Sequence, residues 1–363
     1  MNIVGSLKED LVKEKRISIT PETVKKYTDL GFNINIEKEY AEHLGINDEE
    51  YGKVGAKINI SKEEILEKSD IILKVDGPSA AETKLIKSKS ILISQFDPSL
   101  YQDEIKKLNE KNIKIFSLNL LPRITRAQSM DVLSSQANLA GYKAVVESFS
   151  KFEKVIPMMM TAAGTVPATK VLVIGAGVAG LQAIATAKRM GAIVFATDVR
   201  TAAKEQVESL GGNFLLVEGS ENLETEGGYA KEASKEFKQK QENLLSETLK
   251  KIDIVICTAL IPGRKAPLII KENMIKNMKS GALIYDLAAS QGGNTAFVEA
   301  DKIVHKYGIK IMGEKNILNK LPVSASNLYA KNLFNFVSNL YDKKNKKINI
   351  NLEDEIIKKT LIS

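Results

Sequence analysis

The feature that most constrains the fold of this chain is a glycine-rich turn, Gly175-Ala-Gly177-Val-Ala-Gly180. An apolar run at 171–174 ends directly before it, and a helical pattern at 181–189 follows directly after it. A second apolar run, at 193–197, ends in Asp198. This order of strand, glycine turn, helix, strand and acidic residue is the complete fingerprint of a dinucleotide-binding βαβ unit. The sequence therefore predicts a parallel α/β sheet with a dinucleotide site at its carboxyl edge.

Each glycine of the turn has a physical task. Gly175 permits the tight turn, Gly177 lets the backbone approach a pyrophosphate, and Gly180 lets the helix pack close to the strand. The pyrophosphate is expected at the N-terminus of the helix, where unpaired N–H groups favour negative charge. Val178 and Ala179, in the first turn of that helix, are therefore predicted cofactor contacts.

The end of the second strand decides which cofactor is expected. Asp198 should accept hydrogen bonds from the adenosine ribose hydroxyls and repel a 2′-phosphate, which predicts NAD(H). Val199 and Arg200 follow it and belong to the predicted site. Arg200 leaves an alternative open, because an arginine near this position can hold a 2′-phosphate. Asp198 is given more weight because it occupies the strand end itself.

Strand and helix patterns alternate along the rest of the chain. Short apolar runs predict strands at 2–4, 32–36, 71–74, 91–94 and 113–116, with helices at 21–30 and 61–68 between them. A long helical pattern covers 127–152, and further strands are expected at 252–257 and 282–286, with a helix at 326–341. His43 and His305 fall in polar helical patterns and are expected on the surface.

This alternation predicts an α/β fold with two Rossmann-like, doubly wound parallel-sheet domains joined by a long helix. The first expected domain is discontinuous and consists of residues 1–139 and 311–363. The second, residues 140–310, is the expected NAD(H)-binding domain.

Composition narrows the range of functions. The net charge is +7, from 52 basic against 45 acidic residues, but the lysines are spread along the chain and there is no Trp. Nucleic-acid binders instead cluster their basic residues on one face, so no nucleic-acid partner is expected. The single cysteine, Cys257, indicates a reducing compartment. Neither a targeting leader nor an apolar stretch of the ~20 residues that span a bilayer is present, so no direct membrane insertion is expected.

Several segments carry a resemblance to a known family. They are LPRITRAQSMDVLSSQANLAGYKAV at 121–145, the glycine-rich turn with its flanks, ETEGGYAKE at 224–232 and CTALIPGRKAPLII at 257–270. Together they resemble the NAD(H)-binding component of proton-translocating NAD(P)+ transhydrogenases, which is related to alanine dehydrogenases. The resemblance covers nearly the whole chain and includes KEKRISITPE at 13–22, which alanine dehydrogenases share.

The resemblance implies a division of labour among subunits. This chain would bind NAD(H), a partner subunit would bind NADP(H), and a membrane subunit would couple hydride transfer to proton movement. It also implies a homodimer in the cytoplasm, associated peripherally with the inner membrane through its partner subunits.

The resemblance further implies which residues act at the nicotinamide end. Arg123, Gln128 and Asp131 match the family's loop around the nicotinamide and are the predicted catalytic residues, and Ser134 would bind the cofactor with them. If the segment is helical, their spacing of three places Gln128, Asp131 and Ser134 on one face. Arg123 and Asp131 could form a charge-assisted pair that fixes the loop. The alternative is that these are ordinary polar residues on a helix surface.

Two loop residues complete the predicted site. Tyr229, in the Gly-Gly-Tyr loop, is expected to close over NADH, with an exposed loop aromatic as the alternative. Arg264 follows a strand and is expected at the carboxyl edge of the sheet, where such folds bind ligands. The closing segment at 321–332 also resembles the family, but it is shortened and lacks an expected arginine.

Acid–base groups for amino-acid oxidation are scarce. Alanine dehydrogenases carry a histidine at or near the place of Asn119, and asparagine cannot shuttle a proton. Lys74 does match a substrate lysine of those enzymes, so an alanine dehydrogenase acting alone stays open, as does a non-catalytic NAD-binding module. Hydride exchange between two nicotinamides needs orientation and close approach but no proton shuttle. Because cysteines and histidines form no cluster, no metal site is predicted.

Overall fold

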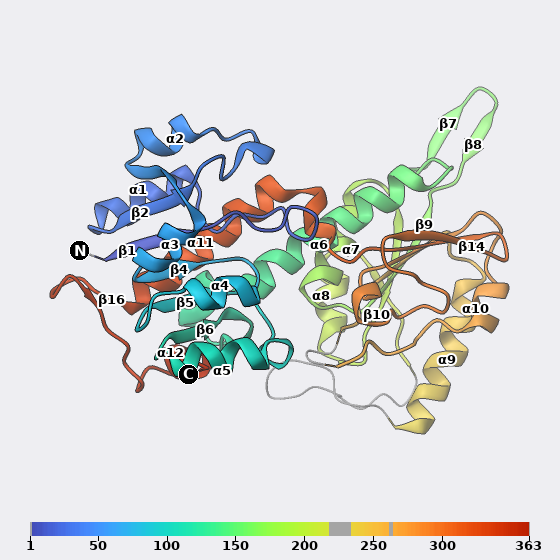
Figure 1. Ribbon diagram of the computed structural model, residues 1–363. Coiled ribbons are helices and arrows are strands. Elements are labelled where there is room, and N and C mark those ends of the chain that lie inside the picture. Colours follow the sequence, from blue (N-terminus) through green and yellow to red (C-terminus); the bar gives the residue numbers. More distant parts are fainter. Residues whose placement is uncertain (1, 218–233, 261–263, 363) are drawn as a thin grey trace. The chain divides into compact units, whose positions relative to one another are not determined.

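The computed structural model describes residues 2–217, 234–260 and 264–362, and it divides into two compact units (Figure 1). The first unit comprises Met1–Gln136 and Leu318–Ser363, and the second comprises Ala137–Ile317. Helix α6, Val132–Lys151, begins in the first unit and ends in the second. The predicted α/β class, with two parallel sheets linked by a long helix, is confirmed.

The first unit is built on a six-stranded parallel sheet in the order β3-β2-β1-β4-β5-β6. The strands are β1 Ile3–Ser6, β2 Asn33–Glu37, β3 Ala56–Ile60, β4 Ile71–Leu73, β5 Ile91–Ser94 and β6 Lys114–Ser117. The chain starts in the middle of the sheet and adds strands outward in both directions, which is doubly wound topology. Seven helices accompany it among the described residues: α1 Pro21–Asp29, α2 Asp48–Lys53, α3 Lys62–Lys68, α4 Ala80–Leu85, α5 Gln102–Glu110, α11 Pro322–Leu340 and α12 Glu355–Thr360.

Both faces of this sheet are buried. Ile71 and Leu73 of β4 belong to one apolar cluster, whereas Ile72 between them belongs to another. Successive strand side chains point to opposite faces, so a strand covered on both sides must be apolar throughout. This explains the short continuous apolar runs from which the strands were predicted.

The second unit is built on a seven-stranded sheet in the order β11-β10-β9-β12-β13-β15-β14. The strands are β9 Lys170–Ile174, β10 Ile193–Thr197, β11 Asn213–Phe214, β12 Ile254–Cys257, β13 Leu283–Asp286, β14 Lys302–Lys306 and β15 Ile309–Gly313. All pairs are parallel except β14 with β15. Its further helices are α7 Val178–Arg189, α8 Ala203–Ser209, α9 Lys235–Leu249 and α10 Glu272–Lys276. Strand order reverses between β9 and β12, which is where open sheets of this kind bind ligands.

Two secondary-structure predictions are wrong. His305 lies in strand β14 and not in a helix, because Tyr307 (φ 54°) and Gly308 (φ 75°) form a tight turn that pairs β14 antiparallel to β15. The helix expected from Ala127 begins only at Val132, since 125–130 form a 3₁₀ segment, η4, and Asp131 is extended with φ −72° and ψ 93°. Strand β3 was not predicted at all.

A hairpin also lies outside the predicted elements. Strands β7, Met159–Thr161, and β8, Gly164–Val166, pair antiparallel and lead away from the sheet of the second unit (Figure 1). Met158 and Met160 are 61% and 79% exposed. Over the described ranges, no helix combines the length and the apolar character needed to cross a membrane.

Candidate functional site

The glycine-rich turn connects β9 to α7 at the point where the strand order reverses. Gly175 has φ +92°, a left-handed conformation that favours glycine. The Thr258 hydroxyl, just after β12, donates to the carbonyl oxygens of Ile174 and Gly175 at 3.1 and 2.9 Å. The neighbouring strand therefore holds the turn in place.

The three glycines are needed for different reasons. A Cβ on Gly180 would lie 1.8 Å from the carbonyl oxygen of Gly175, and one on Gly175 would lie 2.8 Å from the Thr258 hydroxyl. A Cβ on Gly177 would meet no atom within 4 Å. Gly175 and Gly180 are thus required by the packing of the chain itself, whereas Gly177 leaves open space in front of the turn.

That open space faces a helix N-terminus suited to an anion. Gly177 is the N-cap of α7 and offers no side-chain cap, and Leu181 N–H donates to the Gly177 carbonyl oxygen at 2.8 Å. The N–H groups at the start of a helix lack partners within the helix and carry the positive end of its dipole. The residues present therefore fit the diphosphate of a dinucleotide.

Helix α6 approaches α7 closely beside this turn. A Cβ on Gly141 would lie 2.0 Å from the Ala179 carbonyl oxygen, so only glycine fits at that point of α6. A cavity of about 130 Å³ lies next to the contact. It is lined by Ala137, Ala140, Ala179, Thr258, Leu260, Leu287, Glu314, Lys315 and Ile317. Gly141 and Thr258 were not among the predicted site residues; a glycine within a helical pattern was the available signal for the first.

Asp198 follows β10 directly and its carboxylate is fully hydrogen-bonded. Ala176 N–H donates to Oδ2 at 2.7 Å, and Arg200 N–H donates to Oδ1 at 2.9 Å. The Arg200 guanidinium adds Nε to Oδ1 and Nη2 to Oδ2, both at 2.9 Å. Burial alone would raise the pKa of the Asp198 carboxyl, but the hydrogen bonds from Arg200 and Ala176 lower it below its ordinary value. This pairing was not foreseen from sequence.

The predicted catalytic segment belongs to the first unit and has two parts. Gln128 is exposed on η4, and Arg123 is exposed just before that segment. Asp131 instead caps α6: its Oδ1 accepts the Ser134 N–H at 2.9 Å and its Oδ2 accepts the Ser134 hydroxyl at 2.5 Å. Gln128, Asp131 and Ser134 therefore do not share one helix face, because the backbone leaves the helical conformation at Asp131. The pairing of Arg123 with Asp131 stays a prediction.

Helix α11 holds this segment in place. The side-chain amides of Asn332 and Asn335 both donate to the Ser129 carbonyl oxygen, at 2.8 and 2.9 Å. The Ser135 hydroxyl donates to Asn332 Oδ1 at 2.7 Å. The C-terminal segment thus fixes the residue next to Gln128 and the first turn of α6 together, a role for two asparagines that was not predicted from sequence.

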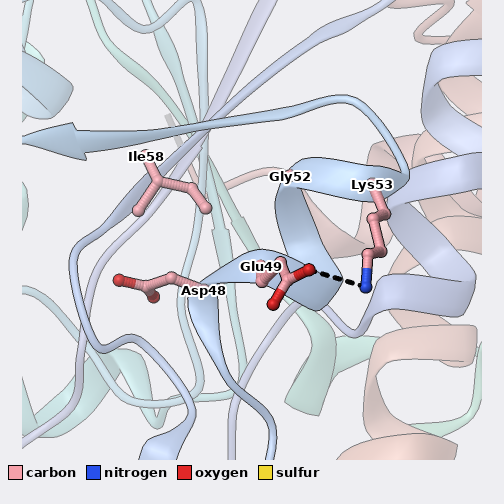
Figure 2. A pocket seen from close by; sticks show the side chains of 5 residues that line it. All are labelled: Asp48, Glu49, Gly52, Lys53 and Ile58. Atoms are coloured by element: carbon pink, nitrogen blue, oxygen red, sulfur yellow. Dashed lines mark ion pairs between the residues drawn. The ribbon is translucent and has the colours of Figure 1, made fainter.

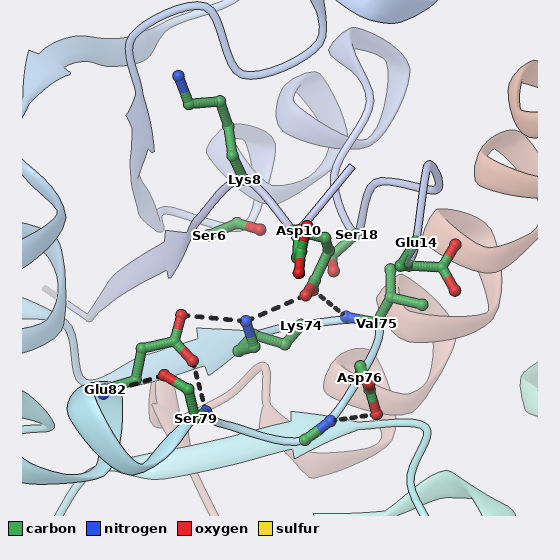
Figure 3. Close-up of polar contacts among 12 residues, drawn as sticks. Ser6, Lys8, Asp10, Glu14, Ser18, Lys74, Val75, Asp76, Ser79 and Glu82 are labelled. Atoms are coloured by element: carbon green, nitrogen blue, oxygen red, sulfur yellow. Dashed lines mark hydrogen bonds and ion pairs between the residues drawn. The ribbon is translucent and has the colours of Figure 1, made fainter. Parts of the chain in front are cut away.

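The first unit also contains a buried ionic cluster around Lys74. Its ammonium group contacts Glu9 at 3.1 Å and Glu82 at 3.3 Å, and all three side chains are at most 6% exposed (Figure 3). Burial opposes ionisation, yet attraction to Lys74 and a hydrogen bond from Lys62 lower the pKa of Glu82 to about 2. Burial raises the pKa of Glu9. Arg16, nearby in sequence to Glu9, is paired in the same way, with both oxygens of Glu14. Both of these buried cations are therefore neutralised by the chain's own carboxylates.

The remaining predicted residues lie apart from these groups. Arg264 is exposed in the segment after β12, and Tyr229 lies outside the described residues. His43 is exposed, and its Nε2 lies 2.8 Å from the Lys15 carbonyl oxygen. Asn119 is half-buried on a short 3₁₀ turn, Leu118–Leu120. Burial raises the pKa of the Cys257 thiol, at the end of β12.

One further hollow lies on the surface of the first unit, over α2 and β3. Asp48, Glu49, Gly52, Lys53 and Ile58 line it, and Glu49 pairs with Lys53 at 2.8 Å (Figure 2). None of the predicted site residues lies there. An exposed ion pair of this kind contributes little binding or stability.

Comparison with known proteins now defines the class of this fold and site. The chain matches the family models "Alanine dehydrogenase/PNT, N-terminal domain" over residues 5–140 and "Alanine dehydrogenase/PNT, C-terminal domain" over residues 144–363. It therefore belongs to the alanine dehydrogenase/PNT family.

Within that family the similarity lies on the transhydrogenase side. The first of the chains that form the NAD(P) transhydrogenase alpha subunit of Rhodospirillum rubrum is 46% identical over 98% of this chain and 94% of its own length. The crystal structure of transhydrogenase from Sinorhizobium meliloti is 44% identical, with a TM-score of 0.89 over 100% of this chain and 98% of that one. An L-alanine dehydrogenase structure, at 20% identity and a TM-score of 0.81 over 99% and 95%, shows the shared fold alone. The resemblance stated from the sequence motifs is confirmed.

Proposed function

We propose that this chain is the NAD(H)-binding subunit of a proton-translocating NAD(P)+ transhydrogenase. In the reaction, NADH and NADP+ are converted to NAD+ and NADPH by transfer of one hydride, with NADP(H) held on a partner subunit. The observation that carries this proposal is the open space at Gly177 before the uncapped N-terminus of α7, in a chain similar over its whole length to a transhydrogenase subunit.

The second unit supplies the grip on the adenosine and diphosphate portion of the cofactor. The backbone from Gly175 to Gly180, including Val178 and Ala179, would hold the diphosphate by N–H groups and the helix dipole. Asp198, flanked by Val199, would accept hydrogen bonds from the adenosine ribose hydroxyls. These contacts are the same before and during transfer, so they set affinity and do not accelerate the chemical step.

The nicotinamide end is assigned to the predicted loop residues. When bound, the reduced nicotinamide supplies the hydride, and this chain has to orient it and keep its approach open. We assign orientation to Arg123, Gln128, Asp131 and Ser134, with Gln128 reaching toward the partner's nucleotide because its amide offers both donors and an acceptor.

Two more residues belong to this proposal. Tyr229 would cover the bound cofactor, and Arg264 would lie at the carboxyl edge of the sheet. Their roles come from the resemblance of their loops to those of transhydrogenases.

The buried cations argue against an amino-acid dehydrogenase acting alone. A keto or amino acid substrate carries a carboxylate that needs an unpaired cation, whereas Lys74 and Arg16 are each already paired with carboxylates of this chain. Displacing these partners would leave buried charges uncompensated, at a cost of several kcal/mol. The purified chain should therefore produce no pyruvate from L-alanine and NAD+.

The proposed partners are a second copy of this chain and the membrane and NADP(H)-binding subunits. We propose that the chain works in the cytoplasm, at the inner membrane, through those subunits. The exposed methionines of the β7–β8 hairpin support a self-association surface, because contiguous exposed apolar side chains mark interaction sites.

Calorimetry with NADH and NADPH tests the cofactor assignment. The chain should bind NADH more tightly than NADPH, and Asp198→Ala should narrow the preference while weakening NADH binding. NADPH binding as tight as that of NADH would overturn the proposal of an NAD(H) site.

A further inference from the structure

The carboxylate of Asp198 has no acceptor position left for a ligand. A carboxylate offers about four lone-pair positions. Two are taken by the backbone N–H groups of Ala176 and Arg200, and two by Nε and Nη2 of the Arg200 side chain. The adenosine ribose hydroxyls, which the proposed function assigns to this carboxylate, must therefore displace an existing donor.

The structure indicates which donors can leave. The two backbone N–H groups are fixed by the glycine-rich turn and by the end of β10, and Gly175 N–H is itself bonded to the Thr197 carbonyl oxygen at 2.9 Å. The Arg200 side chain is 17% exposed, against 7% for Asp198, and it extends from the segment between β10 and α8. A rotation of its side-chain torsions frees two acceptor positions without moving the backbone.

We propose that Arg200 is a specificity-determining latch on the Asp198 carboxylate. Its guanidinium occupies the two acceptor positions that an adenosine ribose needs, and it leaves them when a nucleotide with both hydroxyls binds. The inference rests on the proposed NAD(H) site and adds to it a residue that the bound nucleotide has to displace.

The latch changes how the cofactor is selected. With Arg200 in place the carboxylate is locally neutralised, so its bare charge is not what an arriving nucleotide meets. A ribose with free 2′- and 3′-hydroxyls replaces two N–H donors by two O–H donors, and the carboxylate stays fully hydrogen-bonded. A 2′-phosphate brings no such donor and would lie beside a carboxylate stripped of its partner, which is unfavourable.

The cost of opening the latch predicts the effect of removing it. Charge-assisted bidentate pairs are among the stronger hydrogen-bonded contacts, although partial exposure weakens this one. Arg200→Met keeps an unbranched side chain but removes the charge and both donors. It should therefore bind 5′-AMP roughly three- to tenfold more tightly than the parent chain.

The test is calorimetric titration of the full chain with three probes: 5′-AMP, 2′,3′-dideoxy-AMP and adenosine 2′,5′-bisphosphate. Arg200→Met should gain affinity for 5′-AMP and none for the dideoxy compound. Arg200→Lys keeps the charge but cannot form the two parallel bonds, so it should also gain affinity for 5′-AMP. Arg189→Gln removes an exposed arginine at the end of α7 and serves as the matched control, with unchanged affinity.

Each other outcome overturns the latch. Unchanged or weaker 5′-AMP binding in both Arg200 variants would show that the guanidinium does not compete with the ribose. A loss confined to adenosine 2′,5′-bisphosphate would assign Arg200 to holding a 2′-phosphate. If the parent chain binds NADH while the variants gain nothing, only the latch fails; if it binds neither NADH nor 5′-AMP, the proposed function fails with it.

Discussion

Gln128 is placed by backbone contacts of its neighbour and not by its own side chain. The carbonyl oxygen of Ser129 accepts hydrogen bonds from two asparagines of α11, which fixes the short η4 turn. The Gln128 side chain itself is exposed. An exposed amide on a fixed turn can reach a partner's ligand while its own backbone stays in place.

Gln128→Asn tests this role because it shortens the side chain by one methylene and keeps the amide. With the partner subunits present, the rate of hydride transfer in single-turnover experiments should fall at least roughly tenfold, since misplacing reacting atoms by about 1 Å costs on the order of 10²-fold. NADH affinity should change by less than about 1.4 kcal/mol. An unchanged transfer rate, or a loss of affinity in proportion to the rate, would rule out the bridging role.

The glycine turn offers a matched pair of substitutions. Gly177→Ala should fold normally but bind NADH at least roughly tenfold more weakly, because its Cβ enters only the open space assigned to the diphosphate. Gly180→Ala should lower the free energy of unfolding by about 1–3 kcal/mol, because its Cβ meets the Gly175 carbonyl oxygen. Denaturant unfolding and NADH titration of both variants decide this; full NADH affinity in Gly177→Ala would refute the placement of the diphosphate.

At the scale of elements, the β7–β8 hairpin is the portion of the second unit that least resembles a self-contained fold. Two-stranded hairpins are marginally stable alone, and this one carries exposed methionines. Replacing both Met158 and Met160 by lysine should convert a dimer to a monomer, because the charges would be buried at a two-fold interface. Sedimentation equilibrium measures the change, with Lys343→Gln, on the far C-terminal segment, as a control. A parent chain that is monomeric at micromolar concentration would contradict the homodimer.

The elements that could be predicted from sequence are those whose own residues determine them. The strands around the glycine-rich turn were recognisable because burial on both faces demands apolar runs. The edge strand β14 was not, since its exposed Lys-Ile-Val-His-Lys pattern gives no such run and its pairing depends on the turn at Tyr307. The break at Asp131 was missed because a cap depends on a local backbone change. The Arg200 pairing and the α11 contacts depend on side-chain geometry that spacing does not reveal.

At the scale of the whole molecule, the buried carboxylates make stability depend on pH. The pKa of Glu82 in the folded chain, about 2, lies below its unfolded value, so its contribution is present at neutral pH and is lost as pH falls from about 4.5 toward 2. The pKa of Asp198 is also lowered and acts in the same direction. The raised pKa of Glu9 acts oppositely, with its contribution lost as pH rises.

The melting temperature should therefore fall steeply between pH 5 and pH 3, and Glu82→Gln should flatten this region of the curve. The contribution removed is on the order of 3 kcal/mol. Glu49→Gln, which alters only an exposed ion pair, should leave the curve as it is. Equal slopes for the parent chain and Glu82→Gln would show that the Lys74 cluster does not govern acid unfolding.

The central claim is that this chain donates or accepts hydride through NAD(H) only toward a nucleotide on a partner subunit. The most direct measurement uses NADH deuterated at the transferring position of the nicotinamide, mixed with this chain and a transhydrogenase subunit that carries NADP+. Mass spectrometry should find the deuterium in NADPH, and only when both proteins are present. Deuterium that never reaches NADPH, together with NADH formation from L-alanine and NAD+ by this chain alone, would contradict the account.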